Sequence, residues 1–291
     1  MANSKNNQVI QLGDYSDSKF ETFLVFFTNL KFNKPEKIPI KNNETYDWKT
    51  SLRMKVNAVY LLSNEVNSQY NKALIANEEL EIKGIISDLE STLLLIKFET
   101  LLNSVYSMCD NLAFVDQKLH PGIKKLFNEQ RKNISKYRVK YPEYSEYLDL
   151  IERTEWYDTL HTMRSESVHY LPGFVYHSST GLGILYQNMV HSKDRIEIDN
   201  INEYVTDLIS HLNKFLEKYG EYHLKQFINE RHETYFPCWI PKGAGFLVGG
   251  RVLTFFEYLN KLPGRCTALD VPCPNRKNCP AYQKNEGSRN S

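Results

Sequence analysis

Arg164 and His169 are the two residues of this 291-residue chain whose types and spacing best fit a chemical role. A histidine takes up or releases a proton near neutral pH, and an arginine guanidinium can bind an anion through two parallel hydrogen bonds. On a helix, their five-residue separation corresponds to about 140° of rotation and about 7.5 Å of rise. The two long side chains can therefore flank a single groove at the end of a helix.

The segment before His169 has the pattern of a helix with one buried face. Apolar side chains recur there at roughly helical spacing, at Leu148, Ile151, Trp156, Leu160 and Met163. Pro172 has no amide hydrogen and disfavours helical dihedrals at the residue before it, so the helix should end within a residue or two of His169. We expect one helix over residues 148–169, with His169 at least partly exposed in its last turn.

A basic residue near the end of a helix also has a purely structural explanation, because it complements the helix dipole and the last unpaired carbonyls. A loose Arg-to-His spacing arises by chance in a chain of this length. The Arg164–His169 spacing is therefore interpreted together with the secondary-structure elements predicted around it. A β-hairpin and a second long helix are predicted after the pair, and a basic helix before it.

In this arrangement the sequence resembles the HEPN family, helical proteins whose shared motif is an Arg followed four to six residues later by a His. The motif here is Arg164-Ser165-Glu166-Ser167-Val168-His169, and the resemblance covers about residues 50–225. Many members have Asn directly after the Arg, where this chain has Ser165. Members also tend to carry a polar or acidic residue on an earlier core helix, and Asp110 is the candidate for that place, with a simple surface acid as the alternative.

The resemblance implies a metal-independent RNA endonuclease that works as a homodimer, with both motifs facing one cleft. Arg164 would bind the non-bridging phosphate oxygens, and His169 would act as general base or acid around the RNA 2′-hydroxyl. The implied setting is a toxin or phage-defence effector with an antitoxin or defence-system partner protein. The competing interpretation is a non-catalytic HEPN-like module that binds a nucleotide or a protein through the same helix end.

The remaining pattern predicts a mainly α-helical fold, a HEPN-like bundle with a β-hairpin after the motif helix. Helices are expected over residues 16–30, 48–82, 85–115, 123–141, 148–169 and about 200–225, and a hairpin over 174–186. Asp199 or Asn200 is expected to cap the last of these helices. Residues 1–46 form a tail, short helix and loop, residues 47–226 the helical domain, and residues 227–291 a Gly/Pro/Cys-rich extension with a short helix over 252–259. The buried stripe of the helix over 85–115 is expected at Leu89, Leu93, Ile96, Phe98, Leu101, Leu102, Val105 and Met108.

The predicted helix over residues 123–141 is markedly basic. Its cations are interleaved with tyrosines, an arrangement that suits contact with an RNA backbone together with base stacking. We take Lys132, Lys136 and Arg138 as candidate RNA-binding residues. A solvated helix face can have the same composition, so this assignment depends on where the side chains lie.

Four cysteines near the C-terminus are candidate ligands of a structural zinc ion: Cys238, Cys266, Cys273 and Cys279. Four thiolates can close a tetrahedral zinc site. The spacing has no Cys-x-x-Cys knuckle, so unligated cysteines are the alternative. No cofactor is expected for catalysis.

The composition narrows the class of protein further. The formal net charge is +1, so attraction to nucleic acid must come from a local patch. The N-terminus lacks an apolar secretory core, no apolar run is long enough to span a bilayer, and an odd number of cysteines argues against a disulfide framework. We therefore expect a cytoplasmic protein with no membrane partner.

Overall fold

The computed structural model describes residues 19–20, 23–24, 42–83, 89–187, 195–227, 233–242, 245–254, 264–266 and 279–283. These residues fall into two compact units. The first holds the described residues from Tyr46 to Lys218, and the second holds those before Tyr46 and after Lys218. The predicted mainly α-helical class is confirmed. Of the predicted helix over residues 16–30, the four described residues are helical and the others lie outside the described part.

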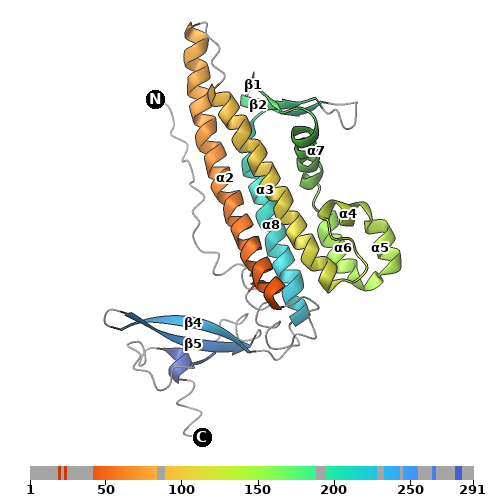
Figure 1. The fold of residues 1–291 in the computed structure, drawn as a ribbon, viewed down its shortest axis with the longest axis vertical. Helices are drawn as coiled ribbons and strands as arrows, with labels where there is room; N and C mark the ends of the chain where they lie inside the picture. Colours follow the sequence, from red (N-terminus) through yellow and green to blue (C-terminus); the bar gives the residue numbers. More distant parts are fainter. Residues whose placement is uncertain are drawn as a thin grey trace. The chain divides into compact units, whose positions relative to one another are not determined.

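Three long helices form the body of the first unit, and Figure 1 shows them side by side. They are α2 (Asn42–Lys83), α3 (Leu89–Leu119) and α8 (Ile201–Phe227). Helix α2 contributes its residues from Tyr46 onward, and α8 contributes its residues up to Lys218. The indole Nε1 of Trp48 donates to the Asn111 carbonyl at 3.0 Å, and the Tyr60 hydroxyl donates to the Asn213 amide oxygen. These bonds link α2 to both of its neighbours.

The apolar stripe of α3 is only partly as predicted. Phe98, Leu101, Leu102, Val105 and Met108 are fully buried, which confirms the second half of the stripe. The first half is wrong, since Leu89, Leu93 and Ile96 are 64%, 36% and 54% exposed. The N-terminal half of α3 therefore presents apolar side chains to solvent within the first unit.

Five short elements follow α3, and they correct two predicted helices. They are α4 (Phe127–Lys132), α5 (Ile134–Lys140), the 3₁₀ turn η3 (Pro142–Tyr144), α6 (Ser145–Glu152) and α7 (Trp156–His169). The basic helix predicted over 123–141 is two helices that meet at Asn133. The helix predicted over 148–169 is broken after Glu152, where the buried Thr154 hydroxyl donates to the Ile151 carbonyl at 2.6 Å. A side chain bonded to the backbone in this way competes with helix continuation.

A buried polar cluster ties α4 and α6 to the end of α3. The Tyr147 hydroxyl lies between the Asp116 carboxylate, at 2.9 Å, and the Gln130 amide oxygen. The Gln130 amide nitrogen donates to the Ala113 carbonyl at 2.9 Å and to the Lys124 carbonyl at 2.6 Å. Buried polar groups without partners are costly, so this network fixes where α4 sits.

A small antiparallel sheet follows α7, and its hairpin confirms the prediction for residues 174–186. It contains β1 (Phe174–Ser178), β2 (Gly181–Tyr186) and β3 (Ile196–Ile198) in that spatial order. Gly181 has a φ of 138°, and a Cβ at this position would overlap the Tyr70 hydroxyl. That hydroxyl accepts a hydrogen bond from the Leu182 amide at 3.1 Å, which anchors the sheet on α2.

The start of α8 has the predicted cap. The Asn200 side-chain oxygen accepts from the amides of Asn202 and Glu203 at 3.0 and 3.1 Å. Two of the unpaired amides at the helix N-terminus are thereby satisfied.

The second unit combines helical segments with a second sheet. Phe23 stacks on His223 at 4.9 Å and packs edge-on against Tyr219 at 5.7 Å. The sheet has the order β4 (Glu233–Lys242), β5 (Gly245–Thr254) and β6 (Arg265–Cys266). The short helix predicted over 252–259 is therefore wrong for residues 252–254, which belong to β5. Residues 255–259 lie outside the described part.

Candidate functional site

The motif helix α7 is held by its packing against α3. Tyr157, Leu160 and Met163 are completely buried, and the Tyr106 ring on α3 stacks on Tyr157 with centroids 5.8 Å apart. The helix ends at His169 as predicted, because the chain then runs through Pro172 into β1. Its final turn therefore lies at the surface of the first unit.

His169 is the last residue of α7 and its side chain is exposed, which confirms that part of the prediction. An exposed imidazole at a helix end is accessible to a substrate from solution. No described contact joins it to Arg164, so the two side chains of the motif do not touch each other within one chain. Any joint action requires a substrate group between them or a second copy of the motif.

Arg164 is turned toward α3. Its guanidinium carbon lies 4.6 Å from the centroid of the Tyr106 ring, a cation–π geometry. The Nε atom is buried and, within the described part of the chain, has no hydrogen-bond partner. The guanidinium is thus held against an aromatic face, and no described hydrogen bond occupies its two terminal nitrogens.

Asp110 lies beside this arginine, one helical turn after Tyr106 on α3. Its Oδ1 accepts a hydrogen bond from the Phe127 amide at 3.0 Å, at the start of α4. Burial raises the pKa of Asp110, while the Phe127 amide and the Arg164 charge act in the opposite direction and do not cancel the rise. The structure therefore brings Asp110 near Arg164 but also gives the carboxylate a structural task at the α4 terminus.

His161 is a second histidine at the site, and the sequence did not single it out. Its ring stacks on Tyr106 at 5.7 Å, its Nε2 lies 2.9 Å from the Asn128 amide nitrogen, and its Nδ1 lies 3.5 Å from the Ser165 hydroxyl. The spacing of His161 and Ser165, four residues on one helix, was the available signal. Asn128 comes from α4, which only the tertiary structure places here.

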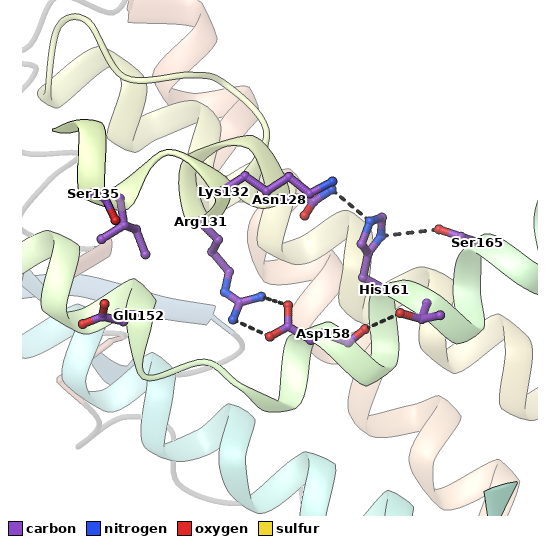
Figure 2. Close-up of a pocket in the computed structure, with 10 residues that line it drawn as sticks. Asn128, Arg131, Lys132, Ser135, Glu152, Asp158, His161 and Ser165 are labelled. Carbon is purple, nitrogen blue, oxygen red and sulfur yellow. Dashed lines mark hydrogen bonds and ion pairs between the residues drawn. The ribbon is translucent and has the colours of Figure 1, made fainter. Parts of the chain in front are cut away.

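Ser165 lies on the side of α7 that faces α4, where Figure 2 shows it beside His161. It lines a pocket of about 600 Å³ together with residues of α4, α5, α6 and α7: Asn128, Arg131, Lys132, Ile134, Ser135, Glu152, Asp158, His161 and Thr162. Neither Arg164 nor His169 lines this pocket. The motif residues therefore border two environments, the α3 contact of Arg164 and the pocket beside Ser165.

The chain immediately after the motif is fixed by Glu99 of α3. Glu99 Oε1 accepts from the Gly173 amide at 3.0 Å and from the Tyr186 hydroxyl at 3.2 Å. Burial raises the pKa of Glu99 despite these two donors. These two hydrogen bonds, one from Gly173 and one from Tyr186 of β2, hold the segment after α7 against α3.

The predicted RNA-binding residues have three different surroundings. Lys132 is exposed and lines the pocket, and Lys136 is exposed elsewhere on α5. Arg138 is bound to two carboxylates of α6, those of Asp149 and Glu152. The charge of Arg138 is therefore paired within the chain, and of the three predicted residues Lys132 and Lys136 are the two without an ion pair among the described residues.

The three described cysteines of this set, Cys238, Cys266 and Cys279, belong to the second unit. Cys238 is paired with Gly249 across β4 and β5, and Cys266 with Arg251 across β5 and β6, so the two lie on strands flanking β5. Cys279 lies just before a short helical turn, whereas Cys273 is outside the described residues. Among described residues no three potential ligands gather around one point, and the structural zinc ion stays a prediction.

Two further findings concern the chain as a whole. In the described part, no helix is both long and apolar enough to cross a membrane. Comparisons with protein-family models, with curated proteins and with solved structures found no match.

Proposed function

We propose that this protein is a metal-independent endoribonuclease of HEPN type that acts as a homodimer. The observation that supports this most strongly is the end of α7, where an exposed histidine follows Arg164. The guanidinium of Arg164 is held against the Tyr106 ring, and its terminal nitrogens have no described hydrogen bond. The spacing of Arg164 and His169 resembles the HEPN motif, and this resemblance is the basis for proposing metal-independent RNA cleavage. By the same resemblance, the proposed setting is a toxin or defence system in which a partner protein restrains the nuclease.

The proposed reaction needs only groups of this chain and of the RNA. One His169 removes the proton of the 2′-hydroxyl, whose oxygen attacks the adjacent phosphorus. The bond from phosphorus to the 5′-oxygen breaks, and that oxygen receives a proton from a second imidazole. Arg164 stabilises the charge that builds up on the non-bridging oxygens. The products are a 2′,3′-cyclic phosphate and a 5′-hydroxyl.

A homodimer would supply the second imidazole, since each motif helix ends in a single His169. Exposed apolar side chains around the motif give such a dimer a surface: Leu89, Leu93, Ile96, Val168, Tyr170, Leu171 and Phe174. Glu99 holds Gly173 against α3, so the apolar part of α3 and the chain after α7 are neighbours. Figure 1 shows the β1–β2 hairpin beside this half of α3.

The nuclease activity is tested by incubating the purified protein with single-stranded and structured RNA in EDTA. Wild type should cleave and leave 2′,3′-cyclic phosphate ends, and His169→Ala should lower the rate about 10²–10⁴-fold, as expected for loss of a general acid or base. His211→Ala is the matched control, because His211 is an exposed histidine on α8. Unchanged activity in His169→Ala, or cleavage abolished by EDTA, would contradict the proposal.

The dimer is tested by sedimentation velocity at micromolar concentration. Wild type should sediment as a dimer, and Leu171→Asp should shift it toward monomer, because a charge enters an apolar contact. Val139→Asp is the control, since Val139 is an apolar side chain of α5 that is 87% exposed. A wild-type protein that is strictly monomeric under these conditions rules the dimer out.

The second candidate function is a non-catalytic HEPN-like module that binds a nucleotide or a partner protein through the same helix end. The observation that favours it is the orientation of Arg164 over Tyr106, with no described contact to His169. A protein that binds RNA in a filter assay, yet leaves every strand intact at long incubation times, would favour this alternative.

A further inference from the structure

The pocket beside Ser165 is not used by the proposed cleavage step. Its volume of about 600 Å³ is in the range of small-ligand sites. Figure 2 shows its polar residues arranged around one opening, with His161 and Asn128 at one end and Ser135 and Glu152 at the other. The pocket is large enough for a small ligand and is lined in part by the helix that carries the motif.

The imidazole of His161 is held in a defined orientation. The Asn128 amide nitrogen donates to Nε2 at 2.9 Å, so the ring proton resides on Nδ1, which lies 3.5 Å from the Ser165 hydroxyl. One ring face is covered by Tyr106. In this arrangement the Asn128 amide oxygen and the Ser165 hydroxyl proton are not used by His161, and they can serve a ligand as acceptor and donor.

The charges of the pocket are mostly compensated within the chain. Arg131 makes a two-pronged contact with Asp158, and its side chain is only 11% exposed. Glu152 is paired with Arg138 of α5. Lys132 is the pocket cation for which the described residues provide no ion pair. A highly charged phosphate group therefore does not fit the interior, whereas a neutral planar group with its own donors and acceptors does.

The pocket is also adjacent to the motif along α7. Ser165 follows Arg164 directly and precedes His169 by four residues, so Ser165 and His169 lie on nearly the same side of the helix, about 6 Å apart along it. A group seated in the pocket would be a near neighbour of any phosphate handled by His169.

We propose that this pocket holds one unpaired nucleobase of the RNA next to the scissile phosphate, so that the nuclease has a base preference. This inference rests on the proposed function. Single-stranded RNA is recognised through splayed-out bases whose edges form hydrogen bonds with side chains. The base edge contacts Asn128 and Ser165, and Lys132 at the rim contacts the sugar-phosphate backbone.

The first test measures direct binding, independently of cleavage. The four nucleoside 3′-monophosphates are titrated into wild type and variants, with affinity read by calorimetry or NMR. Wild type should favour one base, and Asn128→Ala should weaken that nucleotide about tenfold and flatten the preference, since hydrogen bonds to the base are lost. Asn128→Asp keeps the size of the side chain, but it removes the donor that holds His161 and places a negative charge beside the base edge, so it should also change the preference. Lys132→Ala should weaken all four nucleotides about equally.

The controls for this titration are Asn103→Ala and Lys214→Ala. Asn103 donates only within α3, to the Glu99 carbonyl, and Lys214 is exposed on α8. Neither change should affect binding. No binding by wild type, or equal affinity in wild type and both Asn128 variants, would overturn the base pocket.

The second test separates this proposal from the nuclease itself. Cleavage positions are mapped by sequencing on an RNA library with wild type and Asn128→Asp. A change in the base next to the cut supports the pocket, and an unchanged preference overturns it. If nothing is cleaved but a mononucleotide binds through Asn128, the nuclease proposal fails while the base pocket is retained.

Discussion

Two arginines near α7 have similar local geometry but different partners. The Arg131 guanidinium lies 5.4 Å from the Tyr157 ring centroid, and the Arg164 guanidinium lies 4.6 Å from that of Tyr106. Both Nε atoms are buried and without a partner among the described residues. Arg131, however, binds Asp158 with both terminal nitrogens, whereas the Arg164 guanidinium has no described hydrogen bond and only the neighbouring charge of Asp110.

The difference shows that the partner of an arginine decides whether its hydrogen-bond donors are used within the fold or remain unoccupied. A bidentate carboxylate satisfies the guanidinium fork, so Arg131 joins α4 to the start of α7. An aromatic face orients a guanidinium without occupying its donors, as the proposed contact of Arg164 with a phosphate requires. We expect loss of Arg164 to lower the rate of catalysis. Loss of the contacts that position α4, such as those of Arg131 and Tyr147, should instead lower stability.

Among the changes that test this comparison, replacement of Arg164 has the largest expected effect. Arg164→Ala should lower the RNA cleavage rate about 10²–10³-fold, as expected for one lost transition-state contact. Arg164→Lys should recover little, because a point charge cannot reproduce two-pronged contact with a phosphate. The measurement is single-turnover cleavage of both variants, with thermal unfolding confirming that they are folded. Full activity in Arg164→Ala would remove the distinction between the two arginines.

A smaller effect, confined to stability, is expected at the network that positions α4. Tyr147→Phe leaves the buried Asp116 and Gln130 oxygens without the tyrosine hydroxyl, which should cost about 1–3 kcal/mol of unfolding free energy. Chemical denaturation monitored by circular dichroism measures this change. The cleavage rate per folded molecule should change far less than in Arg164→Ala, and an equal loss of both would contradict the separation of roles.

The smallest effect is a pH dependence at Asp110. Because burial raises its folded pKa above the usual 3.8, the carboxyl binds its proton more tightly in the folded chain. Its contribution to stability is fully present below the unfolded pKa and is lost as pH rises through the folded pKa. Asp110→Asn should therefore gain stability relative to wild type as pH rises from 3.8 toward neutrality.

Denaturation midpoints across this pH range test the prediction, with Asp110→Ala as the comparison. The Asn side chain can still accept from the Phe127 amide, whereas Ala cannot, so the Ala variant should be less stable at every pH. Some pH dependence should remain in both variants because burial also raises the pKa of Glu99. A wild type and Asp110→Asn with identical pH dependence would show that Asp110 titrates normally.

Much of the local structure could be predicted because single residues determine it. Pro172 ends α7, and Asn200 caps α8. The break between α6 and α7 was missed because Thr154 acts through a hydrogen bond to the backbone, without Pro or Gly as a signal. Strand β4 was missed because it contains Pro237 and Pro241, which its position at the edge of the sheet accommodates.

The candidate site was only partly predictable, because some of its residues are close in sequence and others are brought together by tertiary packing. Arg164 and His169 are close in sequence, so their helix and its exposed end followed from local patterns. Tyr106, Asn128 and His161 meet only through the packing of α3, α4 and α7. The residues Leu89, Leu93 and Ile96 continue the periodicity of a buried stripe but are exposed, and periodicity alone cannot tell a buried apolar face from an exposed one.

The most direct test of the proposed function is cleavage of a DNA strand that contains one ribonucleotide, carried out in EDTA. The strand has a single 2′-hydroxyl, so the proposed reaction can cut only at the phosphate that follows it. Wild type should cut there and leave a 2′,3′-cyclic phosphate, while His169→Ala should not cut measurably. Cleavage at other positions, or equal cleavage of the all-DNA strand, would contradict attack by the 2′-hydroxyl and with it the proposed role of Arg164 and His169.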